Sequence, residues 1–149
     1  MWNKKHSLLL SKIATLGFTL GILAVLALAP RFARWIIAVA DSAQPSIYTF
    51  LLITFYSGGP IALVLVWKLY QLLNNISKQQ VFIWDNVKYL RVISWLCFIG
   101  GTLATISVFY WIFWLPVGVV AYFMCLIVRV VKNILAEAVT IKEEMDYTI

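Results

Sequence analysis

The sequence predicts an all-α fold: an integral membrane four-helix bundle in which the last helix extends into the cytoplasm. The first observation is composition, since 63% of the 149 residues are hydrophobic and only 12% are charged. That leaves too few polar side chains to cover a water-exposed surface. The second is that 13–30, 42–67 and 92–128 contain no charged residue, and span 18, 26 and 37 residues. A membrane-spanning helix needs about 20 residues, so these stretches accommodate one, one and two spans.

Each uncharged stretch gives an approximate position for its helices. We expect a single four-span membrane domain over residues 1–149, with helices at about 8–29, 47–73, 89–112 and 115–138 and a cytoplasmic tail at 139–149. The last stretch is divided because Pro116 follows an aromatic cluster, which favours a tight hairpin at the outer membrane interface. The cluster consists of Tyr110, Trp111, Phe113 and Trp114. One long buried helix is the alternative.

The first helix has the outline of a signal peptide. Lys4 and Lys5 precede an apolar run that ends in the small-residue triplet 27–29. Pro30 directly follows the potential cleavage site and is unfavourable for cleavage. We therefore expect this segment to remain as a membrane helix.

Two glycine patterns concern packing within the membrane. Gly58, Gly59 and Pro60 interrupt the second helix, and we interpret them as a packing kink, although broken helices also line binding sites in transporters. Gly17 and Gly21 form a G-x-x-x-G pair in the first helix. Packing within the bundle explains this pair, and a homodimer seam is the alternative.

Basic residues are divided unequally between the two sides of the membrane. With four spans, Arg31 and Arg34 lie on one side, and the other ten lysines and arginines lie on the side of the termini. The positive-inside rule then places both termini in the cytoplasm. The main cytoplasmic loop is at 71–91, where Asp85 or Asn86 is expected to cap the third helix.

The fourth helix is expected to continue beyond the bilayer as an amphipathic extension. Apolar residues recur there at three- and four-residue steps, at Val131, Ile134, Ala138, Ile141 and Met145. The tail that follows is acidic, and we interpret it as a binding element that acts with the main loop. A solvated end is one alternative, and docking of the tail onto the basic loop residues is another. Those loop residues are Lys78, Lys88 and Arg91.

The sequence contains no recognisable catalytic or metal-binding pattern. Hydrolase and nucleotide-binding motifs are absent, and no ionisable residue lies near mid-membrane. Cys97, Cys125 and the single histidine, His6, lack the spacing of metal ligands. We therefore expect a protein that is not an enzyme and that uses no cofactor and no metal.

Two segments resemble those of a known family. The loop-to-helix segment VFIWDNVKYLRVISW and the ending IKEEMDYTI resemble the corresponding segments of YoaS-like proteins, a family of small four-span bacterial membrane proteins of unknown function. The resemblance extends over nearly the whole chain. Tyr147 departs from it, because the family usually has leucine at this position. The resemblance implies a location in the bacterial cytoplasmic membrane.

Family members are often encoded beside a small Cro-like helix-turn-helix protein. The resemblance therefore implies a membrane regulator or sensor that docks or sequesters a small cytoplasmic transcription factor, without binding nucleic acid itself. The expected partner-binding residues are Phe82, Asn86, Arg91, Lys142, Glu144, Asp146, Tyr147, Thr148 and Ile149. The alternatives are an immunity or self-protection protein against a membrane-active peptide, favoured by the aromatic hairpin, and a small transporter subunit that uses the kink at Pro60.

Overall fold

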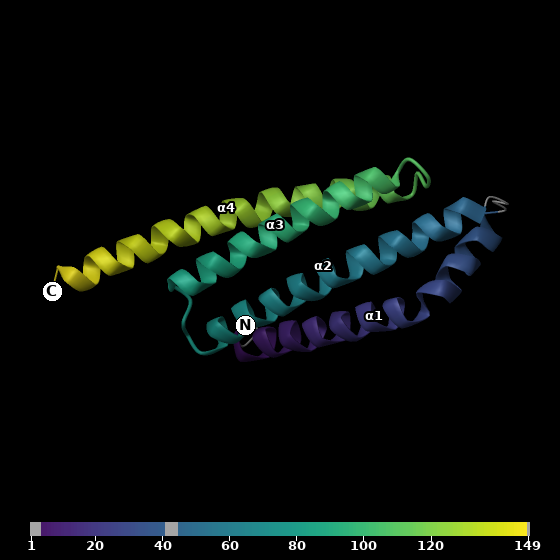
Figure 1. The fold of residues 1–149 in the computed structure, drawn as a ribbon. Helices are drawn as coiled ribbons and strands as arrows, with labels where there is room; N and C mark the ends of the chain where they lie inside the picture. Colours follow the sequence, from purple (N-terminus) through teal and green to yellow (C-terminus); the bar gives the residue numbers. More distant parts are fainter. Residues whose placement is uncertain (1–3, 41–44, 149) are drawn as a thin grey trace.

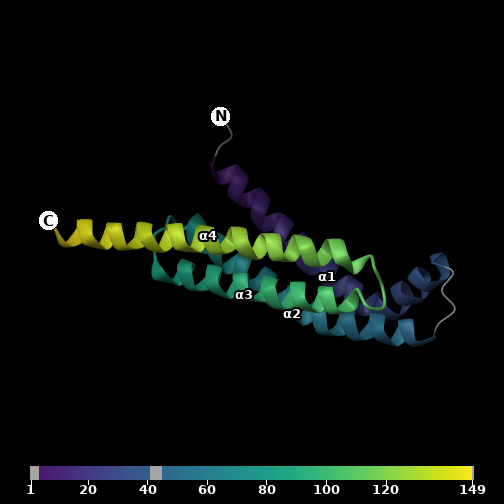
Figure 2. The same ribbon diagram turned by 90° about the horizontal axis from the view of Figure 1, so that it is seen from above.

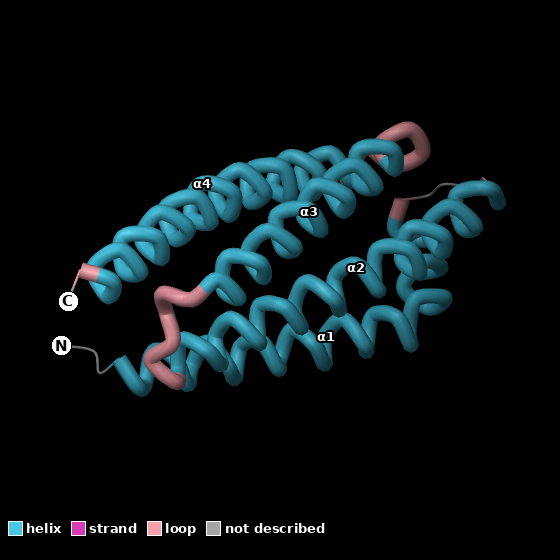
Figure 3. Tube along the Cα trace, turned by 60° about the vertical axis from the view of Figure 1, so that its left-hand side comes forward, coloured by secondary structure: helices cyan, strands magenta, loops and turns pink. Residues whose placement is uncertain are grey.

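The computed structural model describes residues 4–40 and 45–148, and four helices account for most of them (Figure 1). Their bounds are α1 Lys4–Val39, α2 Pro45–Ser77, α3 Trp84–Ser107 and α4 Trp114–Tyr147. No strand occurs in the described part of the chain, as Figure 3 also shows. The prediction of an all-α four-helix membrane fold is confirmed.

The helices run up and down, and each packs against its neighbours in the sequence (Figures 1 and 2). The start of α1 and the end of α4 lie toward one end of the bundle, which we call the termini end. The α2–α3 connection at 78–83 also lies there, and the α3–α4 connection at 108–113 lies at the opposite, hairpin end. Loop and tail are therefore on the same side of any membrane that the bundle spans.

All four helices are long and apolar enough to cross a membrane, with candidate spans of 34, 32, 24 and 34 residues. At 1.5 Å per residue, a 34-residue helix is about 51 Å long, whereas the hydrocarbon core is about 30 Å thick. The helices fit a multi-pass membrane protein. The three longest also have more residues than are needed to cross the hydrocarbon core, so they can project beyond the bilayer.

The sequence predicts that the first helix ends before Pro30. Helix α1 instead continues through this proline to Val39. Figure 1 shows that the helix changes direction in its last third, as expected where a proline removes a backbone hydrogen bond. Ala29 and Ala33, on either side of this proline, are fully buried. Tight packing of small residues on both sides of Pro30 explains why the helix bends rather than ends.

Helix α2 is also continuous, so Gly58, Gly59 and Pro60 do not interrupt it. A Cβ at Gly59 would lie only 2.4 Å from Leu26 Cδ2 of α1. The glycine therefore permits close approach of α1 and α2, which supports packing as the reason for this pattern.

The end of α2 is a Schellman motif without glycine. The Gln80 amide donates to the Asn75 carbonyl oxygen at 3.0 Å, and the Gln79 amide donates to the Ile76 carbonyl oxygen at 3.0 Å. Gln79 has a φ of 61°, in the left-handed region that glycine usually occupies at this position. The motif turns the chain sharply toward α3.

The expected capping of α3 by Asp85 or Asn86 is not observed. The helix begins at Trp84, and its N-cap residue, Ile83, makes no side-chain capping hydrogen bond. Asp85 instead lies in the first turn, where its carboxylate interacts favourably with the positive end of the helix dipole.

Helices α3 and α4 pack closely through small residues. A Cβ at Gly118 would lie 2.9 Å from Thr105 Oγ1, and one at Gly101 would lie 3.2 Å from the Tyr122 ring. Helix α3 ends at Ser107, earlier than expected, because the turn at 108–113 is wider than a tight hairpin. Helix α4 then continues without a break to Tyr147, and Val139 is its last buried residue in the described chain.

Candidate functional site

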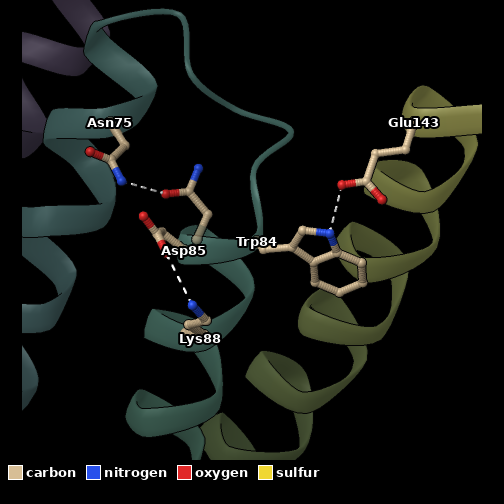
Figure 4. Close-up of polar contacts among 6 residues, drawn as sticks. Asn75, Trp84, Asp85, Lys88 and Glu143 are labelled. Carbon is tan, nitrogen blue, oxygen red and sulfur yellow. Dashed lines mark hydrogen bonds and ion pairs between the residues drawn. The ribbon is translucent and has the colours of Figure 1, made fainter. Parts of the chain in front are cut away.

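One buried side chain fixes the loop between α2 and α3. Asn86, in the first turn of α3, is 0% exposed. Its Nδ2 donates to the carbonyl oxygens of Gln80 and Val81 at 2.7 and 2.8 Å, and its Oδ1 accepts from Asn75 Nδ2 at 2.9 Å. Figure 4 shows the bond from Asn75. Asn86 was expected to bind a partner, but its burial means that it serves the loop and offers no contact surface.

A second polar contact joins the start of α3 to the extension of α4. Trp84 Nε1 donates to Glu143 Oε1 at 2.8 Å (Figure 4). Both side chains are exposed, so water competes for this bond and its contribution to stability is small. Its importance is geometric, because it sets the tail beside the loop.

The other predicted tail residues lie on a solvent-exposed helix. Lys142, Glu144 and Asp146 are exposed, and Tyr147 is 91% exposed. The Thr148 hydroxyl donates to the Glu144 carbonyl oxygen and so closes the last turn. Ile149 lies outside the described residues. The tail therefore presents its side chains outward in a helical arrangement.

The basic loop residues do not pair with the acidic tail. Lys88 Nζ lies 3.4 Å from Asp85 Oδ1 instead, and this exposed pair contributes about 0–1 kcal/mol. Phe82 and Arg91 are exposed at the same end of the bundle. Within the described part of the chain, residues 4–40 and 45–148, no ion pair joins the loop to the tail. The predicted residues thus share one end of the molecule without forming one cluster.

The Trp84–Glu143 contact was not foreseen from the sequence. Both residues occur in the segments that the sequence analysis singled out, but their pairing depends on the register between α3 and α4. The small residues Gly101 and Gly118 bear on that register, because they mark where the two backbones come closest. Counting residues from Gly101 back along α3 and from Gly118 forward along α4 is the way in which the sequence could have predicted this pairing.

A second candidate site is a cavity inside the membrane-spanning part of the bundle. It has a volume of about 1200 Å³ and is lined by all four helices. Among the described residues, no Cα atom of α1 lies within 8 Å of α3 or α4, so the cavity is a groove between α1 and α4. We call it the α1–α4 groove. Its lining is almost entirely apolar, as expected for a surface in contact with hydrocarbon.

Hydroxyl groups at the hairpin end of the α1–α4 groove are engaged with one another, whereas Trp114 Nε1, which belongs to the lining, is buried without a hydrogen-bond partner in the described chain. Thr54 Oγ1 lies 3.0 Å from Ser107 Oγ and 2.6 Å from Tyr110 Oη. Ser107 Oγ also donates to the Leu103 carbonyl oxygen at 2.9 Å. These bonds join α2, α3 and the hairpin and leave the hydroxyls little capacity for a polar ligand.

Gly17 and Gly21 line the α1–α4 groove rather than a helix contact. Nothing lies within 4 Å of a Cβ at either position. Packing within the bundle, the interpretation preferred from the sequence, is therefore wrong for this pair. The glycines leave an open furrow along α1.

A family model described as "Protein of unknown function (DUF2975)" matches residues 31–149. The chain belongs to this family. The match includes α2, α3, α4, the loop and the tail, whereas most of α1 precedes it. None of the curated proteins and none of the solved structures matches the chain significantly. The narrower YoaS-like assignment stays a prediction from the residues.

Proposed function

We propose that this chain is a non-enzymatic membrane regulator or sensor that docks a small cytoplasmic helix-turn-helix transcription factor on its tail. The proposal places it in the bacterial cytoplasmic membrane with both termini in the cytoplasm. The orientation follows from the excess of lysine and arginine at the termini end. The partner class follows from the resemblance to YoaS-like proteins.

The observation that carries the proposal is the exposed apolar stripe on the projecting end of α4. Ile141 and Met145, one helical turn apart, are 51% and 65% exposed although they lie beyond the last buried residue, Val139. Figure 1 shows the end of α4 extending past α3. An apolar stripe on a projecting helix is suited to binding in a hydrophobic groove of a partner. Apolar side chains three or four residues apart on the helix are the anchors in this binding mode.

Charge supplies a second argument for the partner class. Segment 142–147 contains one lysine and three acidic residues, which gives a net charge of −2. DNA-binding proteins carry basic surfaces that neutralise phosphates. An acidic helix that reached such a surface would compete with DNA for it, and this would couple docking to release of the transcription factor from DNA.

The bond between Trp84 and Glu143 supports a role for the loop in the same surface. It places the base of the projecting helix beside the start of α3, and the continuous helix α4 gives the tail its direction. Exposed Phe82 and Arg91 at that end would contact a partner bound beside the tail. No catalytic step is assigned to either segment.

The test is direct binding between the full chain in lipid nanodiscs and a small Cro-like helix-turn-helix protein, the partner class that the resemblance implies. Truncation after Thr140 should abolish binding and leave membrane insertion intact, because the part of α4 that remains, 114–140, is still long enough to span a membrane. The double substitution Ile141→Ser and Met145→Ser should weaken binding roughly 10- to 150-fold. This range corresponds to burial of about half of each side chain, or about 1.5–3 kcal/mol together.

Phe109→Ser provides the matched control, since it removes an apolar side chain that is 95% exposed at the hairpin end. Binding should be unchanged by it and should weaken as salt is raised. Equal binding by the full and truncated chains would refute the proposal. Sensitivity of Phe109→Ser cells to a membrane-active peptide, with no partner binding, would favour the immunity alternative.

A further inference from the structure

The bend in α1 lies at the level of the aromatic hairpin. Gly59 of α2 faces Leu26 of α1, since a Cβ at Gly59 would lie 2.4 Å from Leu26 Cδ2. One turn closer to the hairpin end, about 6 Å along each helix, are Phe55 of α2 and Pro30 of α1. The Phe55 ring centroid lies 6.1 Å from that of Trp114, at the start of α4. Pro30 is therefore level with the hairpin end of the bundle.

The same level marks one boundary of the hydrocarbon core. At 1.5 Å per residue, Phe55 and Asn75 of α2 are separated by about 30 Å, which is the thickness of the core. Asn75 bonds the buried Asn86 at the polar α2–α3 loop, and so marks the opposite boundary. The part of α1 that follows Pro30, segment 31–39, therefore begins where the core ends.

Segment 31–39 exposes an apolar stripe outside its contact with α2. Ala33 is fully buried, and α2 is the only helix with which α1 packs in the described bundle. Phe32, Trp35 and Val39 are exposed at three- and four-residue steps, which places them on one side of the helix. We call these three residues the α1 stripe. Trp35 is 63% exposed, so no described part of the chain covers the stripe.

Two exposed arginines lie beside the α1 stripe. At 3.6 residues per turn, the stripe occupies about 60° of the helix surface, and Arg31 and Arg34 lie about 40° and 100° from its edge at Trp35. In the described chain, Arg31 makes no hydrogen bond or ion pair, and Arg34 Nε donates to the Pro30 carbonyl oxygen at 3.3 Å. The remaining four N–H groups of the Arg34 guanidinium are left for other acceptors.

We propose that segment 31–39 is an interfacial anchor that lies in the headgroup region of the leaflet on the hairpin side. The α1 stripe faces the acyl boundary, and the two arginines bind headgroup phosphates. Helices with aromatic residues on one face and basic residues on another bind membrane surfaces in this way, and guanidinium groups bind phosphate with paired hydrogen bonds. Figures 1 and 2 show that the segment departs from the direction of the rest of α1, so it does not simply continue the span.

The position of the segment selects lipid as its partner. The segment is continuous with a membrane-spanning helix and begins at the boundary of the core, so headgroups surround its exposed side. Large apolar side chains are unfavourable in water, whereas arginines are costly in hydrocarbon. Only the boundary between the two satisfies both the α1 stripe and the arginines. This inference does not depend on docking of a transcription factor.

The test is electron paramagnetic resonance of the full chain in phospholipid nanodiscs, with a nitroxide label on single cysteines placed from 31 to 39. The native Cys97 and Cys125 are replaced by alanine in this series. Collisions with oxygen report hydrocarbon, and collisions with a water-soluble nickel chelate report water. We expect labels at the three stripe positions to lie about 5–10 Å below the phosphates. Labels at the two arginine positions should collide mainly with the nickel chelate.

A charge reversal tests the phosphate contact separately. Arg31→Glu combined with Arg34→Glu should repel the segment from the phosphates, so the label at position 39 should lose its depth of about 5–10 Å. Lys78→Glu combined with Lys88→Glu is the matched control. Both lysines are exposed at the termini end, and their reversal should leave the label at position 39 in place.

Three results would overturn the proposal. One is nickel accessibility at every position from 31 to 39, which would show that the segment projects into water. Another is exclusion of both oxygen and nickel from the stripe positions, which would show that protein, such as a second copy of the chain, covers the stripe. The third is a label depth at position 39 that the arginine reversal does not change.

Discussion

Asn86 provides the strongest test of how the loop is held. Replacement by alanine removes three hydrogen bonds, each contributing about 0.5–1.5 kcal/mol. The freed carbonyl oxygens belong to Gln80 and Val81 at the bundle's end, where water can reach them, so we expect a loss of about 2–3 kcal/mol. This corresponds to a roughly 30- to 150-fold change in the unfolding equilibrium constant. The measurement is the free energy of unfolding in mixed detergent micelles.

Two further variants isolate the hydrogen bonds from the loss of volume. Asn86→Asp keeps the acceptor for Asn75 but places a carboxylate oxygen against two carbonyl oxygens, so it should cost at least as much as alanine. Asn133→Ala, at an exposed position of α4, is the control and should change stability by less than about 0.5 kcal/mol. A loss in Asn86→Ala as small as this control would refute the assigned role.

Three other substitutions test packing, backbone strain and the loop–tail contact by the same unfolding measurement. Gly59→Ala should cost about 1–3 kcal/mol because its Cβ would overlap a neighbouring leucine, whereas Gly100→Ala, with its nearest atom at 3.9 Å, should be neutral. Gln79→Gly should stabilise by about 0.5–1 kcal/mol, since it relieves a left-handed φ; a destabilised variant would contradict this. Trp84→Phe should cost less than about 1 kcal/mol yet speed proteolytic removal of the tail, and an unchanged cleavage rate would argue against the contact.

The fold was predictable because lipid imposes simple constraints on sequence. Uncharged stretches of 18, 26 and 37 residues are typical of membrane spans, and each matches a helix or a helix pair of the structure. Helix ends were less predictable. Pro30 and Pro60 both lie inside helices, since buried neighbours and close packing outweigh the lost backbone bond.

The candidate site was predictable as a region but not as a set of contacts. The end of the molecule that carries loop and tail follows from the number of spans, and the exposed helix at 142–147 follows from apolar periodicity. The role of Asn86 could not be read in this way. An asparagine near a helix start suggests a cap, whereas its amide here reaches backward to the end of α2, and that requires the left-handed turn at Gln79, where glycine would normally be expected.

Glycines have different surroundings in α1 and at the contact between α3 and α4, and the difference explains where the groove arises. Gly101 and Gly118 lie in a close α3–α4 contact, whereas Gly17 and Gly21 face open space. A small-residue pattern indicates that a backbone permits close approach, but it does not specify what approaches. Here only helices adjacent in sequence pack together, so α1 has α2 as its single neighbour in the described bundle. The face of α1 that carries Gly17 and Gly21 therefore has no helix packed against it in the described bundle, and the groove opens along this face.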